Sequence, residues 1–295
     1  MFRGAKNTVC FSLLLQIILA YCFLINAYPQ EKPAGIMYTE LDSYIRYMPS
    51  RSVEAMPGKI EIAEAATQYG YDFKLFDKIP MKFYLDSSYV NINSSVDNVD
   101  LPSHLNGLAL GLEIILPFFS LDKTYQLLGI SPAFYGDDFE SETSGFRTPF
   151  YYLIIRQPSE KLTFLAGFSF YPDYENEILP AVGLIYKPND KLRFNLIPIR
   201  PNITYMLDES LALFVEGSSS INSEFEVDRG DSENVVLRYK GMRLGGGLRL
   251  KFQPALEASF CVGADFNRSF KYRDDEGKVN LKDTVYTELR LQIKY

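Results

Sequence analysis

The last eight residues, Glu288-Leu289-Arg290-Leu291-Gln292-Ile293-Lys294-Tyr295, alternate between polar and apolar side chains without exception. The side chains of a β-strand have a period of two, so this stretch presents one polar face and one apolar face. No element follows Tyr295 that could cover the apolar face. We therefore expect lipid to cover it, which predicts a strand of a membrane protein.

Composition narrows the class of protein. Hydrophobic residues make up 47% of the 295 residues, which excludes global disorder. The formal net charge is -7, and no cluster of basic residues occurs, so a nucleic-acid partner is not expected. Tyr and Phe are abundant but Trp is absent, although Trp is common where membrane proteins meet the lipid headgroups.

The N-terminus has the pattern of an export signal. Basic residues precede an apolar run at positions 9–25, and a small residue, Ala27, follows at the expected cleavage site. We predict a signal peptide at residues 1–27 and a mature chain that begins at Tyr28. A retained membrane anchor and a lipoprotein acylated at Cys22 are the alternatives. Removal of the signal would leave Cys261 as the only cysteine, so no internal disulfide is expected.

The rest of the chain contains fourteen segments in which apolar residues alternate with other residues. They span residues 41–48, 60–76, 81–93, 105–116, 124–135, 148–156, 161–171, 178–187, 191–199, 202–207, 211–227, 234–252, 256–272 and 285–295. Short breaks and long polar breaks alternate between them, which is the pattern of outer-membrane barrels with short periplasmic turns and long external loops. None of these segments is long enough for a spanning helix, and strands cross a bilayer only as a closed barrel.

These segments predict an all-β, antiparallel up-and-down transmembrane β-barrel at residues 41–295, after a short periplasmic segment at residues 28–40. An even number of strands favours fourteen and requires the weak first segment; a miscount around Arg200-Pro201 would leave twelve. A soluble β-sandwich or a carrier barrel would show the same alternation. The membrane barrel is favoured because the second face carries Gly, Ala and Ser with isolated charges, whereas soluble strands present Lys, Glu and Thr to water.

Several short sequence motifs support this interpretation. They are Tyr47-Met48-Pro49-Ser50, Gln126-Leu127-Leu128-Gly129-Ile130, Pro188-Asn189-Asp190 and Leu196-Ile197-Pro198. With them, residues 43–295 resemble an uncharacterised family of bacterial outer-membrane β-barrels, described only as a domain of unknown function. The resemblance implies location in the bacterial outer membrane, with its lipid as a partner, and it implies no activity and no site residues.

The end of the chain is similar to the signal that the barrel-assembly machinery reads in many barrels, so this machinery is a second expected partner. The residues of this signal are Leu289, Leu291, Ile293 and Tyr295.

Charged residues on the second face are the candidates for lining the lumen. They are Asp72, Lys74, Lys82, Asp86, Glu113, Arg193, Glu216, Arg243, Arg249, Lys251, Glu257, Asp265, Glu288 and Arg290. Their signs are nearly balanced. They predict either a water-filled pore whose charged walls orient solutes or a lumen closed by ion pairs across the barrel.

Catalysis is not expected. The single histidine, His104, follows Ser103, and neighbouring residues of a strand point to opposite faces, which would prevent a direct pairing of base and nucleophile. One histidine and one mature cysteine supply no zinc site, and the acidic residues at 137–142 and 274–276 match no calcium loop. Gly245-Gly246-Gly247 is not followed by a helix, so we interpret it as close packing in the wall and expect no cofactor.

The function expected from the sequence is a non-catalytic outer-membrane channel or binding protein for small solutes. The alternatives are a lipid-modifying barrel enzyme that uses His104 and a structural or adhesive barrel that acts through its acidic outer loops.

Overall fold

The computed structural model describes residues 38–54, 56–96, 99–118, 121–137, 145–220, 223–229, 232–273 and 278–294. The predicted signal peptide, most of the predicted periplasmic segment, Tyr295 and most of the acidic residues of the two outer loops lie outside these ranges. No helix within the described ranges has the length and hydropathy needed to cross a bilayer.

The described residues form one sheet of eighteen strand segments. The segments are β1 (Tyr38–Ser52), β2 (Lys59–Leu75), β3 (Ile79–Ser94), β4 (His104–Pro117), β5 (Thr124–Ile130), β6 (Ala133–Gly136), β7 (Phe146–Arg147), β8 (Phe150–Ser159), β9 (Leu162–Phe170), β10 (Ile178–Tyr186), β11 (Leu192–Asn195), β12 (Asn202–Met206), β13 (Leu211–Ser219), β14 (Glu224–Arg229), β15 (Ser232–Gln253), β16 (Leu256–Tyr272), β17 (Lys278–Asn280) and β18 (Thr284–Lys294).

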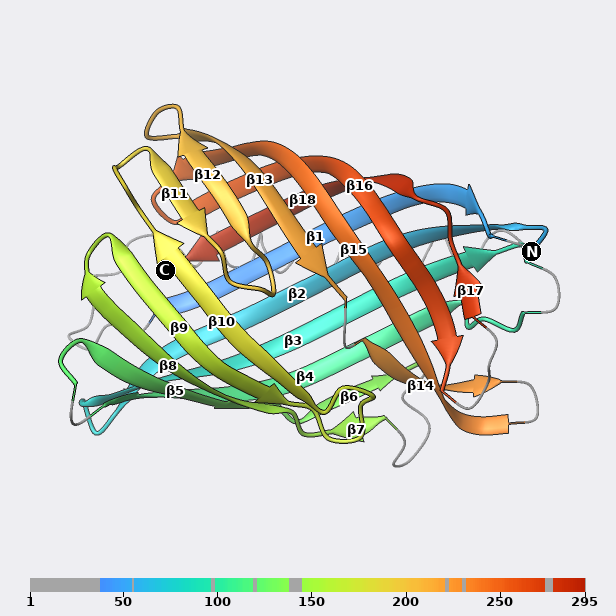
Figure 1. Cartoon of the computed structure of the whole chain (residues 1–295), viewed down its shortest axis with the longest axis horizontal. Coiled ribbons are helices and arrows are strands. Elements are labelled where there is room, and N and C mark those ends of the chain that lie inside the picture. Colours follow the sequence, from blue (N-terminus) through green and yellow to red (C-terminus); the bar gives the residue numbers. More distant parts are fainter. Residues whose placement is uncertain are drawn as a thin grey trace.

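The sheet closes into an antiparallel barrel of fourteen strands (Figure 1), as predicted. The pairs β5 and β6, β7 and β8, β13 and β14, and β17 and β18 each form one strand of the wall. Closure joins β18 to β1, from Glu40 opposite Lys294 to Tyr47 opposite Thr287. The weak first segment of the sequence is therefore a full strand of 15 residues, and its first residue is Tyr38 rather than the expected residue 41.

The two faces of the wall have opposite chemistry. Large apolar side chains on one face stay about half exposed, for example Leu110 at 48%, Leu244 at 55% and Leu289 at 58%. Charged side chains on the other face are buried, for example Arg46 at 4% and Glu288 at 3%. In a single closed sheet, only the inner face can bury side chains in this way. The apolar face is therefore the outer face, and it forms a belt for contact with lipid.

The end of the barrel with the long loops is closed by its own strands. Segment β14 crosses this mouth and pairs in parallel with β6, where Asp137 N–H donates to the Glu226 carbonyl at 3.2 Å. Beneath it, apolar side chains of β1 to β4 and β13 to β18, including Ile60, Leu237 and Phe270, form one buried cluster inside the barrel. Among the described residues, the outer part of the interior is thus packed with side chains.

The glycines of β15 test the predicted close packing in the wall. A Cβ at Gly247 would collide with the carbonyl oxygen of Phe260, whereas a Cβ at Gly246 would lie 3.3 Å from the Phe214 carbonyl oxygen. Backbone atoms of a paired strand cannot move aside as a side chain can, and overpacking costs about 1 to 3 kcal/mol.

We therefore predict that Gly247→Ala lowers the temperature at which the barrel loses its compact form on heat-modifiability gels, while Gly246→Ala leaves it nearly unchanged. Equal shifts for the two variants would contradict the packing described here.

Candidate functional site

The strand register places all fourteen predicted lumen residues on the inner face. Lys82 stands opposite Glu113, Arg243 opposite Asp265, and Lys251 opposite Glu257. The remaining members follow from the same alternation in β2, β3, β11, β13, β15 and β18. Whether solutes pass over these residues stays a prediction.

A chain of buried ion pairs crosses the interior, and Glu64 is its first centre. Its Oε1 accepts from Arg243 Nη2 at 2.6 Å and from the Tyr239 hydroxyl at 2.7 Å, while its Oε2 pairs with Arg46. Arg243 also pairs with Asp265 at 3.0 Å. Each of these ionic side chains is at most 7% exposed, so the charges depend on one another for the interactions that water would otherwise supply.

Glu288 is the second centre of this chain of ion pairs. It accepts from Arg46 Nε at 2.9 Å and from Arg200 Nη2 at 2.7 Å, and Arg200 Nε also donates to Glu216 at 3.0 Å. Arg200 lies in the loop between β11 and β12, so the network ties this hairpin to β13, β18 and β1.

Three members of this network were not predicted. Arg46 lies in the segment with the weakest pattern, and Arg200 lies in a break between two predicted strands. Glu64 has the same even parity as Asp72 and Lys74 on β2, so the alternation could have identified it.

Other predicted lumen residues make local contacts. Lys82 pairs with Glu40 at 3.1 Å, and the Tyr151 hydroxyl donates to Glu113. Arg290 pairs with Asp42 at 3.4 Å.

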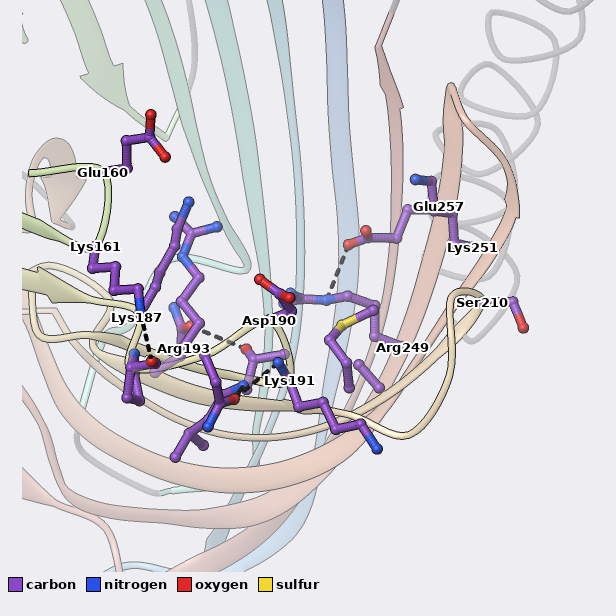
Figure 2. Close-up of a pocket in the computed structure, with 17 residues that line it drawn as sticks. Glu160, Lys161, Lys187, Asp190, Lys191, Arg193, Ser210, Arg249, Lys251 and Glu257 are labelled. Carbon is purple, nitrogen blue, oxygen red and sulfur yellow. Dashed lines mark hydrogen bonds and ion pairs between the residues drawn. The ribbon is translucent and has the colours of Figure 1, made fainter.

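A cavity of about 680 Å³ opens at the end of the barrel with the short turns (Figure 2). Its volume is in the range of small-molecule sites. The inner faces of β11, β12, β13, β15 and β16 form one side, and the turns before β9 and after β10 form the other. Four predicted lumen residues, Arg193, Arg249, Lys251 and Glu257, lie here, with Lys161, Lys187 and Lys191 from the turns, which were not predicted.

The cavity carries more positive than negative charge. Six of its lining residues are Lys or Arg and three are Asp or Glu, namely Glu160, Asp190 and Glu257. Glu257 is already occupied by Arg249 at 3.0 Å. Figure 2 shows Lys187, Lys191 and Arg193 among the side chains that surround this cavity. The lining of this cavity therefore has a positive formal charge.

Side chains hold the turns at this mouth. Asn189 Oδ1 accepts the N–H groups of Lys191 at 3.0 Å and Leu192 at 2.9 Å. Hydrogen bonds to Asp208 from the Ser210 hydroxyl and from the N–H groups of Ser210 and Leu211 keep the pKa of Asp208 below its usual range. Each carboxylate or amide therefore closes one turn, in the manner of an Asx-turn.

The inner face of β8 to β10 differs from the charged wall. Ile155, Leu165 and Gly183 form one inner row, and Leu153, Gly167 and Ala181 form the next. The sequence did not predict a role for these positions, because their side chains carry no charge. The interior is thus apolar on one side and ionic on the other.

The prediction that Ser103 and His104 point apart is wrong. Ser103 precedes β4 and is not part of a strand, so its Oγ lies 2.9 Å from His104 Nδ1. The imidazole also stacks on Tyr89, with ring centroids 6.2 Å apart.

The other residues considered for chemistry are the cysteine of the predicted mature chain and the possible metal ligands. Cys261 is a buried free thiol, 3.5 Å from the Tyr286 hydroxyl. Within these ranges, His, Cys, Asp and Glu side chains form no group of three that could hold a metal ion.

A closed fourteen-stranded barrel with an outer apolar belt and a charged interior is the fold of a bacterial outer-membrane β-barrel protein. No protein-family model matches the chain, and no curated protein matches its sequence.

Three solved structures illustrate the likeness. A Pseudomonas aeruginosa FadL homologue is 9% identical, over 88% of this chain and 90% of that one, with a TM-score of 0.49. The COG4313 outer membrane channel from Pseudomonas putida F1 is 12% identical, over 91% and 100%, with a TM-score of 0.45. The KdgM porin in complex with disordered oligogalacturonate is 12% identical, over 86% and 98%, with a TM-score of 0.36. Such likenesses transfer no function to this chain.

The ion-pair network generates a stability prediction. Glu64→Ala leaves two buried guanidinium groups without their shared partner, which should destabilise the barrel by about 3 to 5 kcal/mol. Glu257→Ala removes one acceptor from a pair whose side chains are 28% and 31% exposed, so the expected cost is below about 1 kcal/mol.

Urea unfolding of the two variants in lipid vesicles, followed by tyrosine fluorescence, measures both effects. A cost for Glu64→Ala no larger than that for Glu257→Ala would contradict a role of the network in stability.

Proposed function

We propose that the protein is a non-catalytic outer-membrane channel or binding protein for small solutes, and that it prefers anions. The observation that carries this proposal is the cavity of about 680 Å³ at the short-turn mouth, with twice as many basic as acidic lining residues. A solute carboxylate 4 Å from one ammonium group gains about 1 kcal/mol in bulk water and about 4 kcal/mol near a protein surface. Three uncompensated positive charges are therefore enough to select anions over cations.

The closed outer mouth favours binding at the periplasmic end over a permanently open axial pore. Among the described residues, β14 and the buried apolar cluster fill the outer end of the interior. The basic cavity lies on the periplasmic side of this packed region. We propose that the fourteen predicted lumen residues serve this solute path or stabilise its wall. We further propose that the protein belongs to the uncharacterised barrel family that it resembles and is inserted by the barrel-assembly machinery.

Charge reversal at the cavity tests the preference for anions. We predict that Lys191→Glu combined with Arg193→Glu weakens benzoate binding by about tenfold, or about 1.4 kcal/mol. Calorimetric titration of the barrel in lipid nanodiscs measures this affinity. Lys59→Glu combined with Lys278→Glu, at the opposite end, is the control with the same change of net charge.

If the control variant lost the same affinity, the effect would come from the net charge of the protein and not from the cavity. Benzoate binding that is no stronger than binding of tetramethylammonium would overturn the proposal.

The pairing of Ser103 with His104 supports a second candidate function, a lipid-modifying enzyme. A serine within hydrogen-bond reach of a histidine has the first element of an activated nucleophile. Membranes that carry the wild-type protein or His104→Gln are compared by mass spectrometry of their lipids. For the non-catalytic barrel we expect identical acyl compositions, and a difference would establish the enzyme.

A further inference from the structure

The wall of the barrel is interrupted between β10 and β13. The two strands that lie between them, β11 and β12, contain four and five residues, whereas β10 and β13 contain nine each. Figure 1 shows this short yellow hairpin beside its longer neighbours. β10 pairs with β11 only at Ile185 and Tyr186, with one further bond from Leu196 N–H to the Leu184 carbonyl at 2.8 Å.

The outer part of β10 is consequently a free strand edge among the described residues. Backbone groups of a strand alternate between its two edges. The Leu184 carbonyl faces β11. Every second residue has the same orientation, so the backbone polar groups of Val182, Pro180 and Ile178 face the interruption. Pro180 has no N–H group, which is how proteins tolerate an unpaired edge. Val182 is 71% exposed and Ile178 64%, whereas Phe168 on the outer row of β9 is 37% exposed.

This edge borders apolar side chains of the outer face. Ile178 ends an outer row that passes through Phe170, Phe150, Ile130 and Leu112 on successive strands. On the other side, Ser219 continues through Met242, which is 43% exposed. An unpaired edge facing hydrocarbon costs several kcal/mol for each polar group, so such an edge is expected only where it borders a cavity or a passing molecule.

Ion pairs fix the segments on both sides of the interruption. Above it, the loop between β9 and β10 is attached to β15, because Glu175 pairs with Arg238 at 3.0 Å and with Lys240 at 2.8 Å. The hydrogen bond from Lys240, with the nearby charge of Arg238, lowers the pKa of Glu175, so the contact persists at neutral pH. Below it, Arg200 holds the tip of the short hairpin to Glu216 and Glu288.

The inner surface behind the interruption has two chemical characters. Leu165 and Ala181 belong to the apolar rows of β8 to β10, and Leu179 follows Ala181 on the inner face of β10, opposite Ser169. At its margin, Asn195 Oδ1 is a buried polar atom that has no hydrogen-bond partner among the described residues. The basic cavity lies farther toward the short turns, on the inner face of the same hairpin. An apolar surface that leads to a basic one matches a molecule with an apolar chain and an anionic head.

We propose that the interruption between β10 and β13 is a lateral portal between the interior and the hydrocarbon of the membrane, and that a single-chain anionic amphiphile uses it. The chain lies along the apolar rows of β8 to β10, and the head reaches the basic cavity. The choice of an anionic head rests on the proposed function, whereas the portal rests on the strand register alone.

The absence of Trp allows a direct test, because one introduced Trp is the only indole of the chain. Ala181→Trp places it on the inner face beside the portal. Ala166→Trp on β9 is the outer-face control, since Ala166 pairs with Val182, and Gln68→Trp on β2 is the inner-face control away from the portal. Each variant is reconstituted in vesicles of phosphatidylcholine with brominated acyl chains, which quench indole fluorescence on contact.

We expect strong quenching for Ala166→Trp, little for Gln68→Trp, and quenching of Ala181→Trp close to that of Ala166→Trp. Quenching of Ala181→Trp no stronger than that of Gln68→Trp would overturn the portal. All three variants must retain heat-modifiable migration, and a Leu179→Trp variant replaces Ala181→Trp if the latter does not fold.

A terminally brominated dodecanoate in vesicles of ordinary phosphatidylcholine tests the occupant. It should quench Ala181→Trp more than Gln68→Trp, and adding Lys191→Glu with Arg193→Glu should raise the concentration for half-maximal quenching about tenfold, or about 1.4 kcal/mol. Quenching that ignores these charges would overturn the anionic head. Benzoate binding without any dodecanoate quenching at position 181 would overturn the amphiphile but leave the proposed function standing.

Discussion

The structure depends on one constraint, which is that polar groups of the backbone need hydrogen bonds wherever water is excluded. The closure of β18 on β1 satisfies this constraint around most of the wall, from Glu40 and Lys294 to Tyr47 and Thr287. Among the described residues, the exception is the edge of β10 beside the short hairpin of β11 and β12, where Pro180 removes one donor. The place where the constraint is least satisfied is therefore the place where we propose a portal.

The interior is organised by a second consequence of excluding water. Charges inside the barrel are stable only when they neutralise one another, and Glu64 and Glu288 do so for Arg46, Arg243 and Arg200. Because these charges are paired with one another, the central interior has little unpaired charge. The cavity at the short turns has an excess of positive charge because its lysines sit on turns that reach water, where an unpaired ammonium costs little.

Much of the fold could be predicted because alternation with a period of two is a local property. The fourteen strands, including the weak first strand, and the face of each predicted lumen residue followed from it. The candidate site was predicted only in part. Arg193, Arg249, Lys251 and Glu257 were found, but Lys161, Lys187 and Lys191 were missed. Each of the three lysines is the end residue of a predicted segment, and the structure places each just outside the strand, in a turn, where alternation no longer fixes the direction of a side chain. Ser103 and His104 were misjudged because Ser103 lies before the strand begins.

The sequence by itself determined that this chain forms strands with one apolar and one polar face, since each residue's side follows from its neighbours. Only the tertiary structure decided which distant residues meet. It pairs β14 with β6 across the outer mouth and Arg200 with Glu288, and it leaves β10, among the described residues, with no partner along most of one edge. These contacts depend on strand length and on the curvature of the closed wall. Both are properties of the whole barrel, and no short stretch of sequence encodes them.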